Sequence, residues 1–585
     1  MSDKILEWVH ATHIPQTDDG TDAVVVKAYL HKDTGEVVPI LKVEQDLARP
    51  FWITKPQARN HEFKKEWEQI KYLDRYDVPN YRLEEELNVA LNGPMFGKNK
   101  RKRLSELCES PYVYGADIHI ETLLKQKYQT EFTKANGKIT KTTTGFLDIE
   151  TDVVNGNGDT PNIITVTHEN KVYTAILEQF FVVKQSDGTF KRGNLEEFTK
   201  LSKKTLDEHI DKLLDDHLKK NKKSILKKKV QETPFEYFYF IGKTPVDCIR
   251  WIFLRIHENK TDFIGIWNLD FDIPKILNEL KNSNVKYEDV FCPPGLPQKY
   301  RYVKYVRDEK DSADIYKKWH WLHATAYCQF LDSMCLYRIL RTVKGLEGSM
   351  SLDNILKVND LGGKLTFKDD DPVTEELSGI DYHRYMQKNE AYKYIIYNQF
   401  DCISIQLMEW KNDDIGSMNI LGGVSRLCKW PRQTRKVCDG LYFNALEEDM
   451  VTASPGPESV MFTKYDKLFG KTGGAVLRPE RTSGIGLKIF EDRPDIETYL
   501  HNFVSDVDFS GMYPNSTVVA NVSKETKVST GYLIEGFKTN IATQQFYSMM
   551  VSLHENAAFI GNQFFGLPGY EQMEDSFKKH LETTQ

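Results

Sequence analysis

The sequence predicts a mixed α/β (α+β) protein of several domains, and three observations support this class. Short apolar runs such as FLDI (146–149) and FIGIW (263–267) have the length and composition of buried strands. They alternate with longer segments of helical periodicity, such as 246–257 and 393–410. The chain has 585 residues, 40% of them hydrophobic and 12% aromatic, which is enough for about four domains with cores of their own.

Residues 1–140 mix short strands with one polar helical segment, and we expect them to form an amino-terminal domain. AVVVKAYL (23–30) and FWIT (51–54) are predicted strands because they are rich in β-branched and aromatic residues. HEFKKEWEQIKYL (61–73) predicts a helix.

The next predicted strand carries two acids on one face. In GFLDIE the period-two alternation places Asp148 and Glu150 on the same face as Phe146, whereas Leu147 and Ile149 point the other way. Two acids on one face of an apolar strand are costly unless a positive charge lies between them. Carboxylate oxygens select Mg²⁺ or Mn²⁺, and two such ions about 3.5–4 Å apart clamp a phosphodiester for attack by water. The pair therefore predicts the chemistry of a metal-dependent nuclease.

Two further strands and a helix are predicted around this strand. NIITVTHEN and KVYTAIL (162–177) are expected to form two strands joined by a tight turn, which extend the first strand into a sheet. VDCIRWIFLRIH (246–257) predicts an amphipathic helix that packs on this sheet.

A second acidic position follows the strand FIGIW (263–267). PKILNEL (274–280) predicts a helix that opens with Pro274 in its first turn. Asn268 and Asp272 are then expected on the loop that leaves the carboxyl end of the strand, where α/β sheets tend to bind ligands.

The third acidic position lies on a predicted helix, KYIIYNQFDCISIQLMEW (393–410). Tyr397 and Asp401 are four residues apart and share one helix face, so that the phenol can orient an attacking water. Each of these short patterns alone is ordinary in proteins. Their order, each on the element type that the chemistry needs, is much more specific.

These segments resemble the proofreading 3′→5′ exonuclease domain of family B DNA polymerases, an RNase H-like nuclease. FLDIET (146–151) is similar to the first exonuclease motif of that family and YNQFD (397–401) to the third. The segment from Asn268 to Asp272 has the short form of the second motif found in protein-primed phage polymerases. FLDSMCLYRIL and SMSLDNILK (within 330–357) resemble the region between the second and third motifs. The resemblance implies an exonuclease domain over 141–414.

The resemblance also implies roles for individual residues at this site. The catalytic metals, two Mg²⁺ or Mn²⁺ ions, would be held by four acids: Asp148, Glu150, Asp272 and Asp401. Tyr397 would hydrogen-bond the attacking water, and Asn268 and Phe271 would bind the substrate. The implied substrates are DNA primer–template and single-stranded 3′ ends.

A later segment resembles the first polymerase motif of the same family. In DVDFSGMYPNS (506–516), Asp508 takes the place of a catalytic metal-binding acid and Tyr513 that of the aromatic residue under the incoming sugar. GKTGGAVLRP (470–479) stands where the family has a Gly-Gly segment that contacts DNA, which implies this role for Gly473 and Gly474. NVSKET (521–526) is similar to a segment of T-even-like phage polymerases. A partial palm is implied over 466–585, after a return segment at about 415–465 to the amino-terminal domain.

The second catalytic acid of a polymerase and the fingers helix have no counterpart in the sequence. Nucleotidyl transfer needs two acids that hold two metals, and no YGDTDS-like hairpin follows Asp508. We therefore expect the amino-terminal part of a split or truncated DNA-directed DNA polymerase that does not polymerise alone. Its partner in DNA replication would be a C-terminal polymerase subunit with the fingers, the remaining palm and the thumb. A sliding clamp is a further candidate partner.

Two alternatives to an active nuclease remain open. The chain can be an assembly subunit that contributes half a palm, in which case a neighbouring reading frame carries the missing motifs. It can also be a nucleic-acid-binding protein that uses the nuclease fold without activity. The four acids together with Tyr397 argue against a decayed site.

The net charge of −7 hides two dense basic segments, KNKRKR (98–103) and KKNKKSILKKK (219–229). Such segments neutralise phosphates in nucleic-acid-binding proteins, but many charge runs are simply solvated surfaces. Both interpretations remain open at this stage.

Cysteine usage and hydropathy indicate a cytoplasmic protein. The eight cysteines show no CxxC spacing, which argues against a zinc knuckle or a disulfide framework and favours a reducing compartment. No apolar run of about 18 residues and no signal peptide are recognisable, so we expect the host-cell cytoplasm and no membrane partner.

Overall fold

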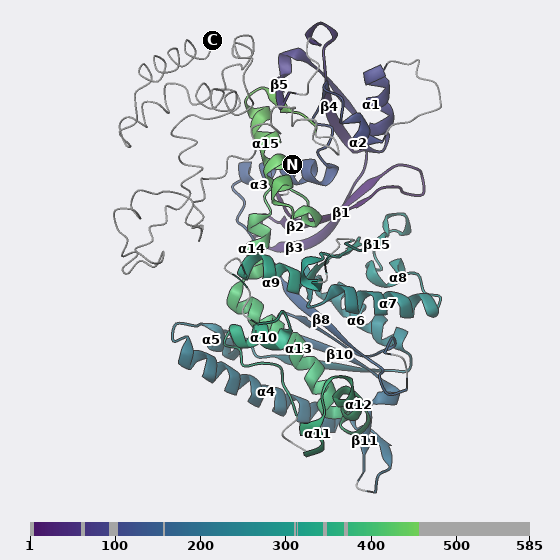
Figure 1. The fold of residues 1–585 in the computed structure, drawn as a ribbon, viewed down its shortest axis with the longest axis vertical. Helices are drawn as coiled ribbons and strands as arrows, with labels where there is room; N and C mark the ends of the chain where they lie inside the picture. Colours follow the sequence, from purple (N-terminus) through teal and green to yellow (C-terminus); the bar gives the residue numbers. More distant parts are fainter. Residues whose placement is uncertain are drawn as a thin grey trace, which may run out of the picture. The chain divides into compact units, whose positions relative to one another are not determined.

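The computed structural model describes residues 5–454, apart from short gaps at 60–64, 93–102, 156–157, 186, 309–311, 313, 343–344, 346–347 and 368–371. Contacts divide the chain into two units, Met1–Val460 and Met461–Gln585, and the described residues all belong to the first. Several sheets and many helices confirm the predicted mixed α/β class (Figure 1). Among the described residues, no helix is long and apolar enough to cross a membrane.

Several predictions fall on residues that the structure does not describe. The predicted palm over 466–585 lies outside the described residues, and so do Gly473, Gly474, Asp508 and Tyr513. Of the basic segment 98–103, only Arg103 is described.

Two small antiparallel sheets form the first part of the chain. One has the order β1 (Ile5–Ile14), β2 (Ala23–His31), β3 (Val37–Glu44). The other has the order β6 (Leu73–Pro79), β4 (Ala48–Thr54), β7 (Val113–Tyr114). The predicted strands 23–30 and 51–54 are thus confirmed. Three helices accompany these sheets: α1 (Leu83–Asn92), α2 (Leu104–Leu107) and α3 (Ile120–Lys134).

The helix predicted over 61–73 is wrong for the described part of this segment. It contains β5 (Trp67–Gln69), the short 3-10 helix η2 (Ile70–Tyr72) and the start of β6. β5 pairs with β18 (Met450–Thr452), and the N–H of Ile70 donates to the carbonyl of Asp449 at 2.9 Å. Pairing with a segment far along the chain therefore replaces the local bonds that a helix would have made.

A six-stranded sheet forms the centre of the described structure. Its strand order is β13 (Glu236–Gly242), β10 (Lys171–Leu177), β9 (Pro161–His168), β8 (Thr144–Thr151), β14 (Phe263–Ile266), β17 (Gln329–Asp332). β8, β9 and β10 form an antiparallel meander, and the other neighbours are parallel. The predicted strands over 162–177 and their tight turn, with Glu169 at φ 50°, are confirmed.

Helices cover both faces of this sheet (Figure 1). On one face lie α13 (Ala391–Asn412) and α4 (Leu195–Lys220), whose apolar side chains share a core with Phe146. On the other face lie α6 (Pro245–Asn259) and α7 (Leu269–Asn282), which share a core with Leu147 and Ile149. The predicted alternation of β8 and the predicted helices 246–257 and 393–410 are therefore confirmed.

The remaining elements of the described chain connect or flank these layers. The helices are α5 (Leu226–Glu232), α8 (Glu288–Phe291), α9 (Ser333–Arg341), α10 (Leu352–Val358), α11 (Pro372–Glu376), α12 (Gly379–Asn389), α14 (Asp414–Leu421) and α15 (Gln433–Glu447). Two hairpins are formed by β11 (Val182–Lys184) with β12 (Phe190–Arg192), and by β15 (Val303–Val306) with β16 (Trp321–Ala324).

After α14 the chain contacts the amino-terminal sheets again. Tyr442 on α15 packs in one small core with Trp52 and Tyr114. The hydroxyl of Ser454 accepts a hydrogen bond of 2.7 Å from the N–H of Ala116. These contacts and the β5–β18 pairing connect the end of the described chain to its beginning.

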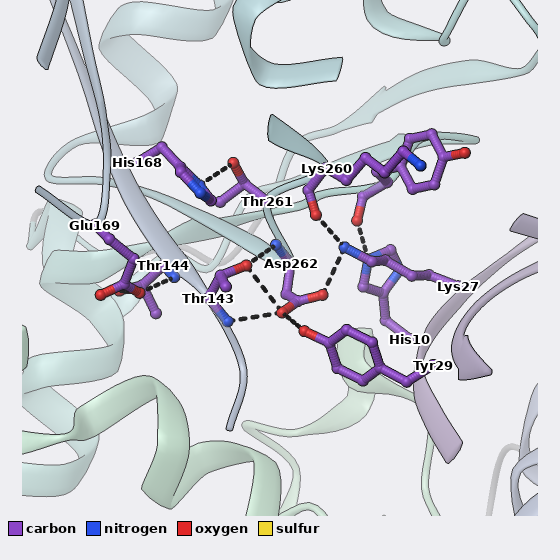
Figure 2. A network of polar contacts seen from close by, with 11 residues as sticks. His10, Lys27, Tyr29, Thr143, Thr144, His168, Glu169, Lys260, Thr261 and Asp262 are labelled. Carbon is purple, nitrogen blue, oxygen red and sulfur yellow. Dashed lines mark hydrogen bonds and ion pairs between the residues drawn. The ribbon is translucent and has the colours of Figure 1, made fainter. Parts of the chain in front are cut away.

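A buried polar network joins the first sheet to the central sheet (Figure 2). The ammonium of Lys27 on β2 lies 2.5 Å from Asp262, which directly precedes β14, and both side chains are fully buried. Tyr29 donates to the same carboxylate, and so does the N–H of Thr143, at 2.7 Å. The network thus fixes the amino ends of β8 and β14, the two strands that lead to the acidic residues.

Candidate metal centre

Three of the predicted acids meet where α13 crosses β8. Asp148 and Glu150 on β8 and Asp401 on α13 each offer a carboxylate oxygen, and these oxygens lie within 4.8 Å of one another. Asp401 is 2% exposed, and the two strand acids are partly buried. This acidic triad can hold a metal ion.

Two further side chains of α13 hold the strand acids in place. Asn398 donates a hydrogen bond of 2.6 Å to Oδ2 of Asp148, and the hydroxyl of Tyr394 donates to Oε2 of Glu150. Tyr394, Asn398 and Asp401 are separated by four and three residues, so the three side chains share one face of α13. Asn398 and Tyr394 were not predicted, although their polar character on the inner face of an apolar helix was an available signal.

A lysine that the sequence did not indicate completes the cluster. The ammonium of Lys364 lies 2.6 Å from Oδ2 of Asp401 and 3.0 Å from the hydroxyl of Tyr397. Burial lowers the pKa of Lys364, but the nearby carboxylates of Asp401 and Asp148 outweigh this effect and raise the pKa above its usual range. The lysine is therefore charged and offsets part of the negative charge. Its position on an irregular segment after α10 gave no recognisable pattern.

Asp272 lies on α7 rather than on a loop, which corrects the prediction. The helix begins at Leu269 with Asn268 as its N-cap, and Pro274 lies inside it. The carbonyl of Asn268 accepts from the N–H groups of Phe271 and Asp272, so the first turn forms upstream of the proline. Pro274 lacks only its own N–H, so it removes one backbone bond and the helix continues to Asn282.

The carboxylate of Asp332 fixes the start of α7. Asp332 ends β17 and is buried, and its carboxylate accepts from the N–H of Leu269 at 3.3 Å and of Cys335 at 2.8 Å. It thereby ties the first turns of α7 and α9 together. Burial raises the pKa of Asp332 to about 7. The sequence offered no reason to select this residue.

Asp272 belongs to the electrostatic environment of the triad without being one of its three members. It is 3% exposed, and burial followed by the charge of Glu150 raises its pKa well above the usual range. Its charge in turn raises the pKa of Asp148. Asn268 is partly buried at the helix start, whereas Phe271 is 46% exposed and open to a ligand.

Burial and, to a smaller extent, mutual repulsion raise the pKa values of the triad acids. Burial and then the charges of Asp272, Asp401 and Glu150 raise the pKa of Asp148 well above its usual range. Burial raises the pKa of Glu150 to about 7, although the Tyr394 hydroxyl opposes this shift. Burial also raises the pKa of Asp401, against the effect of Lys364. A divalent cation would favour the ionised carboxylates and relieve this repulsion.

The donor set fits a hard divalent cation. All donors of the triad are carboxylate oxygens, which suit Mg²⁺ or Mn²⁺ better than Zn²⁺. Oδ1 of Asp401 is buried and accepts no hydrogen bond from the described residues. A buried carboxylate oxygen without a donor is costly, and a metal ion at this position would satisfy it.

Comparison of the sequence with protein-family models and with curated proteins gave no match.

Proposed function

We propose that this chain is a divalent-metal-dependent nuclease that removes nucleotides from the 3′ ends of DNA, built on an RNase H-like fold. The observation that carries the proposal is the triad of Asp148, Glu150 and Asp401, whose oxygens lie within 4.8 Å. The antiparallel β8–β9–β10 meander supports the fold assignment, because an RNase H-like core requires the strand of the first motif to be extended in this way.

Each residue of the site has a role in this proposal. The triad would hold Mg²⁺ or Mn²⁺, with Asp272 contributing charge for a second ion; the metals would activate water and neutralise charge on the scissile phosphate. Tyr397 keeps its proton because burial and then Asp401 raise its pKa well above its usual range. Its hydroxyl, which interacts with Asp401, would donate to the attacking water or to the phosphate once DNA is bound. Lys364 holds Asp401 and Tyr397 in position.

Substrate binding would use the start of α7. Phe271 is 46% exposed, and a nucleobase would stack on its ring on the side away from the Lys275 ammonium, which lies 5.6 Å from the ring centre. Asn268, the N-cap of α7, would contribute its amide. Mispaired 3′ ends would be preferred over paired ends, because the cost of unpairing is smallest for a mismatch.

We further propose that the nuclease is the proofreading part of a split or truncated family B DNA polymerase. This proposal rests on the sequence resemblance of 146–151, 268–272, 397–401 and 506–516. It assigns Asp508 to a polymerase site that a C-terminal subunit completes, with a sliding clamp as a candidate partner in the cytoplasm.

One observation favours a second candidate, a DNA-binding subunit whose nuclease is silent by itself. The Lys364 ammonium already neutralises part of the acidic cluster. In that case the chain would bind DNA but would cleave it only after the C-terminal polymerase subunit is added. The activity assay below distinguishes the two candidates.

The test uses the purified full chain, Mg²⁺ and single-stranded DNA labelled at its 5′ end. We expect a ladder of products shortened from the 3′ end, which is absent with EDTA and absent in the Asp148→Ala/Glu150→Ala variant. Asp187→Asn removes an exposed carboxylate outside the site and serves as the matched control. Equal degradation by the wild type and the double variant would reject the proposed nuclease site.

A further inference from the structure

A lysine-rich turn forms one side of a surface hollow. We call residues 217–229 the lysine turn; it comprises the end of α4, the connection and the start of α5, and it contains seven lysines and no acid. The hollow has a volume of about 640 Å³ and is also lined by Trp410 and Lys411 of α13. Of the seven lysines, Lys220, Lys222 and Lys223 line the hollow.

The lysine turn is held by specific hydrogen bonds. His217 is buried; its Nδ1 lies 3.0 Å from the carbonyl of Asp360 and its Nε2 lies 3.0 Å from the hydroxyl of Ser224. The carboxylate of Asp360 also binds Asn221 and Lys220, each at 3.1 Å. The turn is thus anchored to the segment that follows α10, which distinguishes it from an ordinary solvated charge run.

Two lysines at the hollow have no carboxylate partner. Lys222 and Lys223 are exposed, and no acid within the described part of the chain forms an ion pair with either. By contrast, four other lysines of the turn are paired with carboxylates: Lys219, Lys220, Lys227 and Lys228. Unpaired ammonium groups around a concave surface suit a ligand that carries several negative charges.

Trp410 lines the hollow, and its ring is packed against other side chains of the protein: Phe235 stacks on it with the ring centroids 5.4 Å apart. The ammonium of Lys229 lies 4.0 Å from the centre of the Trp410 ring, and Glu169 accepts a hydrogen bond of 3.0 Å from the indole N–H. Burial lowers the pKa of Lys229 to about 8, and this lysine does not line the hollow. Ile225 is 73% exposed beside the lysines. Apolar and charged groups together suit a sugar–phosphate chain better than an inorganic ion.

The hollow is connected to the metal centre by two segments. Asp360, which holds the lysine turn, precedes Lys364 of the metal centre by four residues, and an extended segment of this length spans at most about 14 Å. On α13, Trp410 follows Asp401 by nine residues, which corresponds to about 14 Å along the helix axis and places the two residues on opposite faces of the helix. A single strand that contacts both places would therefore pass round α13.

We propose that the hollow binds the backbone phosphates of single-stranded DNA, a few nucleotides from the 3′ end that enters the metal centre. The identity of the strand rests on the proposed nuclease function. The contact would be independent of base sequence and sensitive to salt, because Lys222 and Lys223 would replace counterions of the phosphates.

The test compares two variants that each remove two positive charges. Lys222→Ala/Lys223→Ala changes the hollow, whereas Lys203→Ala/Lys204→Ala changes two exposed lysines of α4 outside it. Binding of a fluorescent oligothymidylate of about 16 nucleotides is measured by anisotropy in EDTA, which prevents cleavage. At about 50 mM KCl we expect the first variant to bind roughly tenfold more weakly, with a salt slope reduced by about 1.4. We expect the second to bind like the wild type. Equal affinities of both variants would overturn the proposal.

Two further measurements separate the hollow from the nuclease site and from a membrane contact. Cleavage of a dinucleotide with Mg²⁺ should be unchanged in Lys222→Ala/Lys223→Ala; its loss would mean that the substitution disturbs the metal centre and would overturn the proposal. If the wild type cleaves no DNA but Lys222→Ala/Lys223→Ala still loses oligonucleotide binding, the result supports DNA binding by the hollow and rejects the proposed nuclease. Wild-type binding to phosphatidylserine vesicles without oligonucleotide binding would assign the hollow to lipid and overturn the proposal.

Discussion

The ammonium of Lys364 lies 2.6 Å from Oδ2 of Asp401, which places a positive charge inside a group of buried carboxylates. This ion pair spans two parts of the chain that the sequence gives no reason to connect. It stabilises the ionised form of Asp401, and it also holds the hydroxyl of Tyr397 at the edge of the triad. The acidic cluster is therefore organised by a cation of the protein itself.

Removing this cation should shift the pH dependence of DNA degradation. In Lys364→Met the carboxylates lose a stabilising charge, so their pKa values rise and the acidic limb of the rate profile moves to higher pH. We expect the rate at neutral pH to fall by roughly 100-fold. Lys364→Arg keeps the charge and should restore the position of the limb in part. A profile of Lys364→Met that matches the wild type would contradict this role.

Two tyrosines of α13 should give different phenotypes although each substitution removes only a hydroxyl. Tyr397→Phe should lower the cleavage rate at saturating Mn²⁺ by about 10–100-fold, because it removes a donor to the attacking water or the phosphate. It should also weaken Mn²⁺ binding, because the Tyr397 hydroxyl lowers the pKa of Asp401. Tyr394→Phe should weaken Mn²⁺ binding, because the Tyr394 hydroxyl lowers the pKa of Glu150 and its loss makes that acid harder to ionise. Calorimetry with Mn²⁺ and single-turnover kinetics measure the two effects. Equal losses of the cleavage rate at saturating Mn²⁺ in both variants would refute the assignment.

The metal-free protein should lose stability as pH rises. The pKa of Glu150 is raised to about 7 in the folded state, so the folded protein holds a proton that the unfolded chain has released. The stability that this bound proton contributes to the folded state is present at pH 4.5 and declines as the pH rises towards about 7. We expect the Tm in EDTA to fall by about 5 °C over this range, and Mn²⁺ to restore it mainly at the upper end. In Asp148→Asn/Glu150→Gln the decline should be smaller, and an unchanged decline would show that other groups cause it.

The buried pair of Lys27 and Asp262 should be costly to break on one side only. Lys27→Met leaves a buried, uncompensated carboxylate and should destabilise the described unit by about 3–5 kcal/mol. Lys27→Met/Asp262→Leu removes both charges and should be less destabilised than the single variant. Urea denaturation followed by fluorescence gives the free energies of unfolding. Equal losses in the single and double variants would mean that the charges are not coupled.

Local patterns predicted most elements of the central sheet. The alternation in β8 and the periodicity of α13 are strong because each element buries one defined face, and Asp148, Glu150 and Asp401 follow from them. That these acids act together was implied by the resemblance to the exonuclease motifs, which placed Asp272 in the same set.

The errors and omissions have a common physical origin in contacts between distant segments. The segment 65–73 forms a strand and a 3-10 turn because β18 pairs with it. α7 begins before Pro274 because Asp332 and Asn268 fix its first turn. Lys364 could not be predicted because its chain segment has no periodicity and only the packing of α10 and α13 brings it to Asp401.

The central claim is that Asp148, Glu150 and Asp401 form a divalent-metal site, and direct measurement of Mn²⁺ binding by the full chain tests it. Calorimetric titration should show saturable binding to the wild type and to Asp187→Asn, and loss of this binding in Asp148→Ala/Glu150→Ala. Equal Mn²⁺ binding by the wild type and the double variant would contradict the metal centre and, with it, the proposed nuclease.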